Sequence, residues 1–392
     1  MAPTGGGGGK PLRIQAFSDR TSIRDQLREV HENLKSELPL VTRVAVALYD
    51  DQTDTLKTFV HSTDADTAPF SHYEAKLAQM PSLHDLARGG CARIIDDLGS
   101  WTAASDPLRR LIERAFRSTY TVPFYDQGRF FGFLFFDAKE PGYFSAASIR
   151  HLSVYANLLS LLIMNEISRA SALRSAILVA RKMSHSHNEE TGAHLDRMAR
   201  YAQLIARTIA SSSESNEIDD EFVEFVFLYA PLHDVGKIAV PDRILLKPGR
   251  LSIDEFEIMK THVTAGMEIV ESIARSFRIT AGQHVDLLRN IVRYHHETMD
   301  GGGYPSGCRG PQIPLEARIV AVADVFDALT SERCYKQAWT NDAAFRLLRE
   351  RAGRSFDPLC VDALIGNAEQ LQGIQARFRS NNGFHEGYTD EL

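Results

Sequence analysis

The chain has 392 residues, more than one ordinary hydrophobic core accommodates, so two domains are expected. Apolar residues make up 44% of it and charged residues 24%, a globular composition that excludes disordered and fibrous proteins. The formal charge of -7 argues against a general nucleic-acid binder, because neutralising phosphates requires a basic surface.

The first elements in the chain are a tail and an amphipathic helix. Residues 1–20 contain a run of five glycines and lack the layout of a secretory signal, so we expect a flexible tail. Residues 21–38 follow helical spacing, with Ile23, Leu27 and Leu34 on one face. This helix is predicted to be the first element of the first domain.

Short β-prone runs then alternate with helical patches. The runs at 44–50 and 55–62 predict one hairpin, and those at 119–126 and 129–137 predict another, joined through Gln127-Gly128. Helical spacing occurs between them, at 82–89 and 106–116. We therefore predict a compact α+β domain over residues 21–145.

The order and length of these elements resemble a GAF-type sensory domain, in which a sheet carries helices and often a ligand pocket. The resemblance implies a regulatory role and a ligand that the sequence does not identify. His72, His84 and Cys91 fall in this region, but no ligand spacing connects them. We expect surface or packed side chains there rather than a haem or metal site.

Residues 146–185 predict a long linker helix. Ser145 is a suitable N-cap, and no proline interrupts the pattern that follows it. Two arrangements stay open: a parallel stalk in a homodimer, or a helix that packs on its own domains. The most apolar run, at 158–164, is shorter than the roughly 20 residues of a membrane span, so no membrane is expected.

The cysteines indicate the compartment. Cys91, Cys308, Cys334 and Cys360 are widely spaced and form no CxxC pair, so the sequence predicts neither a zinc knuckle nor a disulfide framework. Reduced thiols in a cytoplasmic protein are the expected state.

The second half of the chain reads as helices and loops, and it contains most of the groups that bind metals. Glu190 and His194 are one helical turn apart and share a face. The other candidates lie in four later segments: His233, Asp234, His262, His295, His296, Asp300, Asp324 and Asp327. Burying so many ionisable groups without compensation would cost several kcal/mol each, roughly, and bound cations remove that cost.

These donors predict a particular kind of metal site. Nitrogen and oxygen donors without thiolate favour Fe, Mn or Zn. The candidates exceed what one ion can bind, so two or more ions are expected, and a carboxylate such as Asp234 can bridge a pair. Two metals about 3.5–4 Å apart are a common device for phosphoester hydrolysis, because they activate water and hold both oxygens of the displacement.

The segment HDVGK at 233–237, with histidines on both sides of it, resembles the HD superfamily of metal-dependent phosphohydrolases. The run HHETMDGGGYP at 295–305 narrows the resemblance to the HD-GYP family, whose members hydrolyse cyclic di-GMP. The resemblance covers roughly residues 186–365 and includes EETGAHLDR, MKTHVTAG and ARIVAVADVFDALTSERCYK. It implies an all-α HD-type bundle over 186–375, with a tail at 376–392.

The resemblance also implies roles for single residues. The metal ligands it implies are Glu190, His194, His233, Asp234, His262, His295, His296 and Asp324. Asp234 would bridge two metals, most simply Fe, alternatively Mn, and Glu190 favours a third. Asp234 and Lys237 are the expected catalytic residues, with Lys237 near the scissile phosphate. The expected substrate contacts are Lys237, Asp300, Gly303, Tyr304, Pro305, Asp327, Arg333 and Lys336.

Two features of these motifs leave room for other readings. Gly301 to Gly303 can bring the backbone close to a ligand or can simply form a structural turn. Cys334 stands where the family commonly has proline, so the adjacent loop is expected to be less rigid. No ligand position is replaced, which argues against an inactive member.

The hypothesis is therefore a cytoplasmic phosphodiesterase that opens cyclic di-GMP to pGpG, with a second cut to GMP left open. Two alternatives remain. One is a cyclic di-GMP receptor whose GYP loop, the segment around Gly303-Tyr304-Pro305, binds a partner protein. The other is an enzyme acting on a mixed cyclic dinucleotide or another phosphoester.

Overall fold

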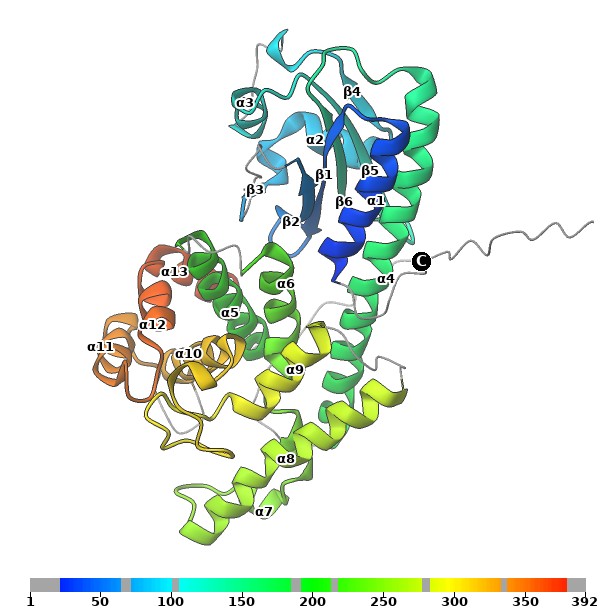
Figure 1. The fold of residues 1–392 in the computed structure, drawn as a ribbon. Coiled ribbons are helices and arrows are strands. Elements are labelled where there is room, and N and C mark those ends of the chain that lie inside the picture. The colour runs from blue at the N-terminus through cyan, green and yellow to red at the C-terminus, as the bar shows by residue number, and fades with distance from the viewer. Residues whose placement is uncertain are drawn as a thin grey trace, which may run out of the picture.

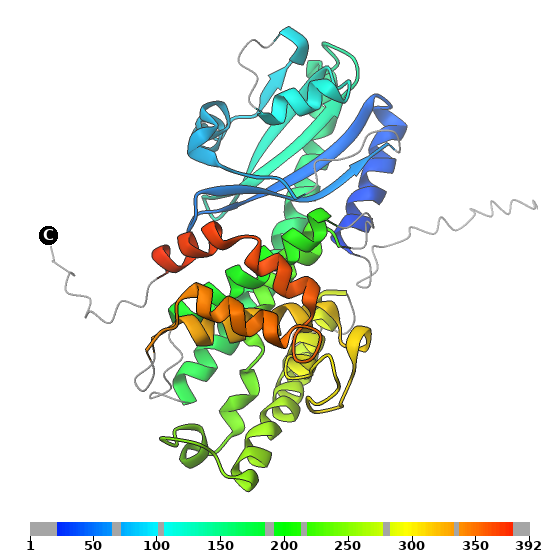
Figure 2. The same cartoon turned by 90° about the vertical axis from the view of Figure 1, so that its left-hand side faces the viewer.

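The computed structural model describes residues 22–64, 72–100, 106–184, 192–212, 218–276, 283–332 and 337–378. Within these ranges the chain forms a sheet domain and a helical domain (Figure 1 and Figure 2). One long helix, α4 (Ala146–Ser184), extends along both domains. The expected α+β domain followed by an all-α bundle is confirmed.

The sheet domain contains one antiparallel sheet in the order β3-β2-β1-β6-β5-β4. Its strands are β1 (Val41–Asp50), β2 (Thr55–Thr63), β3 (Glu74–Lys76), β4 (Arg93–Ile95), β5 (Ser118–Asp126) and β6 (Arg129–Ala138). Its helices are α1 (Ile23–Glu37), η1 (Leu77–Gln79), α2 (Pro81–Gly89), η2 (Leu98–Ser100) and α3 (Asp106–Glu113). Both predicted hairpins are present, whereas the three-residue strands β3 and β4 were not predicted.

Each face of the sheet packs on a different set of helices. Val44 and Leu48 of β1 join the main core with α1 and α4, which lie side by side against the sheet (Figure 1). Ala47 belongs to a second cluster with Phe133 and Leu86 of α2. Alternate residues of one strand therefore bury opposite faces, as the twofold repeat of a strand requires.

The linker helix packs on its own domains, which is one of the two arrangements left open by the sequence. Leu152, Leu159 and Ile163 are buried in the main core. On the other side of α4, Val154 and Leu161 are 67% and 63% exposed. The helix is therefore covered along one face and leaves an apolar face in solvent.

The helix α4 also meets a simple test for a membrane span. Its stretch Ala146–Val179 is long enough, and the most apolar window has a mean hydropathy of 1.3. A third of that window, 33%, is buried inside the protein. A helix that packs into a core meets the same test, so this feature is weak evidence for a membrane.

The helical domain is built around two buried helices, α5 and α10. Its elements are α5 (Gly192–Ser212), α6 (Asp220–Tyr229), η3 (Ala230–Leu232), η4 (Val235–Ala239), α7 (Asp242–Leu245), α8 (Ile253–Ser276), α9 (Gln283–Tyr294), η5 (Gly310–Gln312), α10 (Leu315–Thr330), α11 (Asn341–Arg351), α12 (Pro358–Ile365) and α13 (Ala368–Arg377). Tyr201 of α5 meets Phe326 of α10 edge-on at 5.1 Å, and both rings are fully buried. This contact fixes two of the helices that supply the site.

Buried polar pairs hold the two domains together. Lys57 of β2 forms an ion pair with Glu224 of α6 at 2.5 Å, with both side chains 9% exposed. Asp220 of α6 accepts hydrogen bonds from the Thr58 hydroxyl at 2.7 Å and from the His72 backbone. Breaking one partner of such a pair leaves a buried charge, so the two domains are expected to move as a unit.

The structure places the side chain of His72 against a neighbouring helix, whereas His84 and Cys91 are exposed. The His72 ring contacts Asp220 at 2.8 Å, whereas the side chain of His84 is 40% exposed and Cys91 is exposed. Among the described residues, no group of three metal-binding side chains includes any of them.

Candidate metal centre

The histidine-aspartate doublet lies between two short helical turns. His233 follows η3, and Asp234 immediately precedes η4. A Cβ atom on Gly236 would lie 1.8 Å from the carbonyl oxygen of His262 and 2.4 Å from the nitrogen of Gly266. Backbone thus packs directly on backbone between η4 and α8, which brings Asp234 next to His262.

Replacing Gly236 with alanine is expected to destabilise the protein by about 1–3 kcal/mol, because the methyl group meets backbone atoms rather than a movable side chain. Metal content should also fall, since η4 and α8 must separate. Urea unfolding and metal analysis measure the two effects. Gly373→Ala in α13, where nothing lies within 4 Å of the new methyl, is the control and should stabilise by about 0.5–1 kcal/mol. Equal unfolding midpoints for wild type and Gly236→Ala would contradict the packing argument.

Three histidines of the site share one tautomer. In each, Nδ1 donates a hydrogen bond to a carbonyl oxygen of the preceding turn: His233 to Ala230 at 2.9 Å, His262 to Met259 at 2.7 Å and His295 to Ile291 at 3.0 Å. A carbonyl oxygen can only accept, so Nδ1 carries the proton and Nε2 keeps its lone pair. The backbone thus prepares three nitrogens to bind a cation.

These nitrogens converge on one carboxylate. Nε2 of His262 and of His295 lie 3.3 Å and 3.7 Å from Oδ1 of Asp234, and Nε2 of His233 lies 3.1 Å from its Oδ2. Donor atoms of Asp234, His262, His295 and His296 all lie within 4.8 Å of one another. Helices far apart in sequence therefore meet at a single point.

The donor set fits a divalent metal. Oδ1 of Asp234 and Nε2 of His262 and His295 are buried, yet none makes a hydrogen bond within the described part of the chain. Buried polar atoms without partners are costly, and a cation satisfies such lone pairs together. Imidazole and carboxylate donors without thiolate suit Fe, Mn or Zn.

Electrostatics keeps these donors in their binding forms. Burial lowers the pKa of His296 to about 2 and also lowers the pKa of His262, so both rings are neutral at pH 7. Burial alone would raise the pKa of Asp234, but the positive charge of Lys237 outweighs it and holds that pKa well below its usual value. Lys237 Nζ lies 2.6 Å from Oδ2 of Asp234, which places this expected catalytic lysine at the centre.

Helix α10 supplies two carboxylates one turn apart. Oδ1 of Asp324 lies 3.8 Å from Nε2 of His233, so this predicted ligand borders the cluster. Asp327 accepts hydrogen bonds from Nδ1 of His194 at 2.5 Å and from Nε of Arg197 at 2.7 Å. The Asp327 carboxylate is fully buried and already hydrogen-bonded, and its contact with substrate remains a prediction. Asp327 orients the ring of His194, as carboxylates behind metal-bound histidines do.

The glycine loop folds back on its own backbone. A Cβ atom on Gly303 would lie 2.5 Å from both the Glu297 Cα and the His296 carbonyl oxygen. Asp300 Oδ1 accepts hydrogen bonds from the Thr298 hydroxyl and the Gly302 nitrogen. For Gly303, close backbone approach serves the turn rather than a ligand, so the alternative of a structural turn is supported. Substrate contacts of Gly303 and of the exposed Asp300 remain predictions.

Glu297 is a structural residue that the sequence analysis missed. It is 4% exposed, and its two carboxylate oxygens accept hydrogen bonds from the backbone nitrogens of Ser306 and Cys308. It therefore fixes both ends of the loop beside the two histidines. Its position directly after His296 was the available signal.

Tyr304 forms a wall of the centre. Its ring stacks on the His296 imidazole, with ring centroids 4.7 Å apart. Burial raises the pKa of its phenol, which therefore stays protonated. Pro305 follows it at an exposed position.

Three predicted site residues lie outside the described residues, namely Glu190, Arg333 and Lys336. Their roles as a third-metal ligand and as substrate contacts remain predictions.

Comparison with known proteins assigns the helical half of the chain. The family model described as HD domain matches residues 186–359. The cyclic di-GMP phosphodiesterase response regulator RpfG of Xanthomonas campestris pv. campestris is 47% identical over 188 residues, which cover 48% of this chain and 46% of that protein. A cyclic di-GMP phosphodiesterase of Thermotoga maritima is 36% identical over 208 residues, 52% of each chain.

A third relative has a different substrate in its name. The 3'3'-cGAMP-specific phosphodiesterase 2 of Vibrio cholerae is 38% identical over 192 residues, 49% of this chain and 34% of that protein. The chain thus spans about half the length, or less, of the curated relatives it matches.

The sheet domain is similar to solved GAF domains. The GAF domain/HD domain protein from Geobacter sulfurreducens is 18% identical and covers 37% of this chain and 95% of its own, with a TM-score of 0.30. The phycocyanobilin-bound GAF domain from a cyanobacterial phytochrome is 12% identical and covers 37% of this chain and 86% of its own, with a TM-score of 0.31. Over residues 186–359 this chain matches the HD domain family, and the sheet domain that precedes them resembles solved GAF domains.

Proposed function

We propose that the chain is a phosphodiesterase that hydrolyses a 3'-5' bond of cyclic di-GMP, giving pGpG and, after a second cut, GMP. The observation that carries this proposal is the convergence of three imidazole Nε2 atoms on the carboxylate of Asp234. Relatives named as cyclic di-GMP phosphodiesterases support the choice of substrate.

The proposed centre holds two or three divalent metals, Fe or alternatively Mn. His233, Asp234, His262, His295 and His296 would bind them together with His194, Asp324 and, for a third ion, Glu190. When bound, such metals supply positive charge for the phosphate oxygens and lower the pKa of a coordinated water. The imidazole and carboxylate donors support this assignment.

The chain's own groups have separate tasks in the proposed reaction. Asp234 is buried and ionised, so its negative charge would help to hold the metals. The Lys237 ammonium is 2.6 Å from Asp234 and 22% exposed, so it can reach a phosphate at the centre and donate a proton to the leaving 3'-oxygen. Tyr304 stacks on His296 and so limits the space beside that ring.

The proposal is tested with purified protein loaded anaerobically with Fe(II) or Mn(II). Cyclic di-GMP should disappear and pGpG should form, whereas the His233→Ala variant should lose the activity with its metal. His151→Ala is the control, because that side chain is 60% exposed on α4. Metal-loaded wild type that leaves cyclic di-GMP unchanged, as the variant does, would overturn the proposal. Binding without product would favour the receptor, with the GYP loop as its protein-binding surface.

A mixed cyclic dinucleotide is the second candidate substrate, favoured by the relative named as 3'3'-cGAMP-specific. A competition assay containing both dinucleotides gives the ratio of their kcat/KM values, which defines specificity. Faster consumption of 3'3'-cGAMP would assign the chain to that substrate.

The GAF-like domain is proposed to regulate the metal centre through two helices that lead to predicted metal ligands. Glu221 of α6 accepts a hydrogen bond from the Ile23 nitrogen of α1 and contacts His284 Nε2 of α9, each at 2.9 Å. Helix α6 leads to His233, and α9 ends just before His295. Comparing the activities of Glu221→Gln and wild type at equal metal content tests this coupling.

We also propose a cytoplasmic homodimer through α4. Val154, Leu158 and Leu161 are 67%, 39% and 63% exposed and follow the four-three spacing of a helix seam. A second copy of the helix would cover them. Sedimentation of wild type and Leu161→Asp tests this, since two monomeric samples would refute it.

A further inference from the structure

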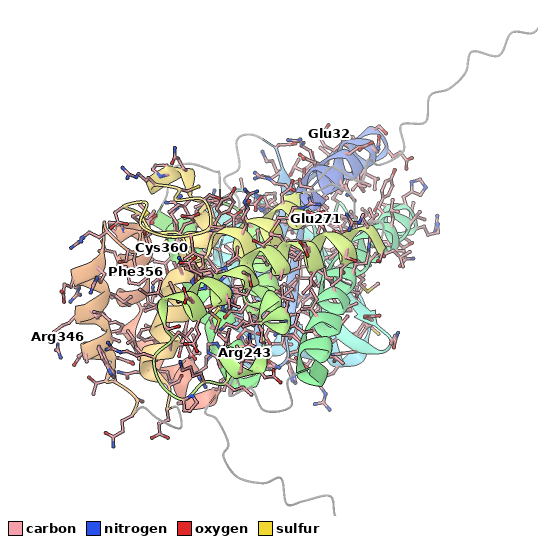
Figure 3. All side chains as sticks on the ribbon, turned by 90° about the horizontal axis from the view of Figure 1, so that it is seen from below. Glu32, Arg243, Glu271, Arg346, Phe356 and Cys360 are labelled. Atoms are coloured by element: carbon pink, nitrogen blue, oxygen red, sulfur yellow. The ribbon has the colours of Figure 1, made fainter. Side chains whose placement is uncertain are left out.

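A row of aromatic rings leads from the metal centre to solvent. The Tyr304 ring, which stacks on His296, meets the ring of Phe256 edge-on with centroids 6.1 Å apart. Phe256 lies in the first turn of α8, and 44% of it is exposed. Helix α8, with Glu271 labelled, lies on the face seen from below (Figure 3). Phe256 is thus the solvent-exposed end of a series that begins at a predicted metal ligand.

One ammonium group lies near both outer rings. Nζ of Lys260 is 5.0 Å from the centroid of Phe256 and 5.5 Å from that of Tyr304. Lys260 follows Phe256 by one helical turn, so both side chains project from the same face of α8. Its ion pair with Glu257, at 2.7 Å, joins side chains that are 29% and 61% exposed. Such a pair contributes little, so Lys260 can exchange it for a ligand anion.

These groups match the half of a cyclic dinucleotide that the metals do not hold. The metals would bind one phosphate, and the rest of the ring needs anchors for flat bases and a second phosphate. An exposed aromatic ring stacks bases of any sequence, and a flexible lysine binds a phosphate as a point charge. The ring of Tyr304 is already contacted by His296, Phe256 and Lys260, so Phe256 presents the more accessible surface.

We propose that Phe256 and Lys260 form a substrate subsite, in which Phe256 stacks on a purine base and Lys260 pairs with the phosphate that is not cleaved. This inference rests on the proposed dinucleotide substrate. It adds to the metal centre two residues that position the substrate and that lie outside its ligand set.

The test compares a cyclic dinucleotide with methyl p-nitrophenyl phosphate, a small diester that reaches the metals without a purine. Phe256→Ala should raise KM for cyclic di-GMP about 10-fold, within the range for loss of one stacked base, with little change in kcat. Hydrolysis of the small diester and the metal content should stay at wild-type values. Phe256→Trp should restore KM, and Ile253→Ala, at an 83% exposed position of the same helix end, is the control.

Lys260 is tested in the same assay. Lys260→Gln should raise KM for the dinucleotide and weaken its salt dependence, and Lys260→Arg should recover most of the affinity. Equal losses for both substrates, or a loss of metal, would show that these residues only support the GYP loop. Unchanged KM in Phe256→Ala and Lys260→Gln would remove the subsite while leaving the proposed enzyme intact. Wild type that cleaves the small diester but no cyclic dinucleotide would remove both.

Discussion

Asp234→Asn is expected to remove metal from the protein and to lower phosphodiesterase activity on the order of 10³-fold, the upper range for loss of one electrostatic group at a reaction centre. The substitution keeps the shape of the side chain and removes its charge. Asp234 is the carboxylate on which His233, His262 and His295 converge, and it is 3% exposed, so solvent cannot replace it. An amide cannot bridge two cations as a carboxylate does.

Metal analysis of anaerobically purified protein measures this effect directly, alongside initial rates. The expected loss of metal affinity is larger than about 10–100-fold, the loss produced by substituting residues that only orient the metal ligands. Asp254→Asn, at an exposed position in the first turn of α8, is the matched control and should keep both metal and activity. An Asp234→Asn protein with full metal content and wild-type rates would show that the cluster is not the reaction centre.

Much of the fold could be predicted from periodicity. The apolar spacing of residues 21–38 predicted α1, and the turn at Gln127-Gly128 predicted the β5-β6 hairpin, because both signals are local. The short strands β3 and β4 carry too few residues for a pattern. Whether the linker helix packs on its own domains depends on distant residues, which a single sequence does not place.

The sequence predicted side chains that cluster at the site, but not the residues that support them. Histidines and carboxylates in helical sequence signal a metal because burying them is otherwise costly. The same reasoning could not assign different roles to Asp324 and Asp327, since both lie on one face of α10. The hydrogen bond from Arg197 to Asp327 distinguishes the two carboxylates. Gly236 likewise gave no signal, because its role is a contact with the distant backbone of α8.

Asp327→Ala is expected to destabilise the protein by about 3–5 kcal/mol, the cost of removing one partner of a buried ion pair. Asp327 is fully buried, and its carboxylate accepts hydrogen bonds from Arg197 and His194, which are each 6% exposed. Alanine leaves the Arg197 guanidinium charge without that carboxylate and the His194 ring without its acceptor. Unfolding in urea at pH 7 measures the loss, with Asp362→Ala, at an exposed position of α12, as the control.

The pH dependence of this loss gives a second, independent readout. Burial alone would raise the pKa of Asp327, but hydrogen bonds from His194 and Arg197 outweigh it, so the folded-state pKa lies below the ordinary value. A carboxylate with a lowered pKa stabilises the fold above its unfolded-state pKa of about 3.9, and this contribution is lost as pH falls through the lower folded value. The difference in unfolding free energy between wild type and Asp327→Ala should therefore be constant near neutral pH and shrink below about pH 4. A difference that persists unchanged in acid would mean that packing, rather than the ion pair, makes Asp327 important.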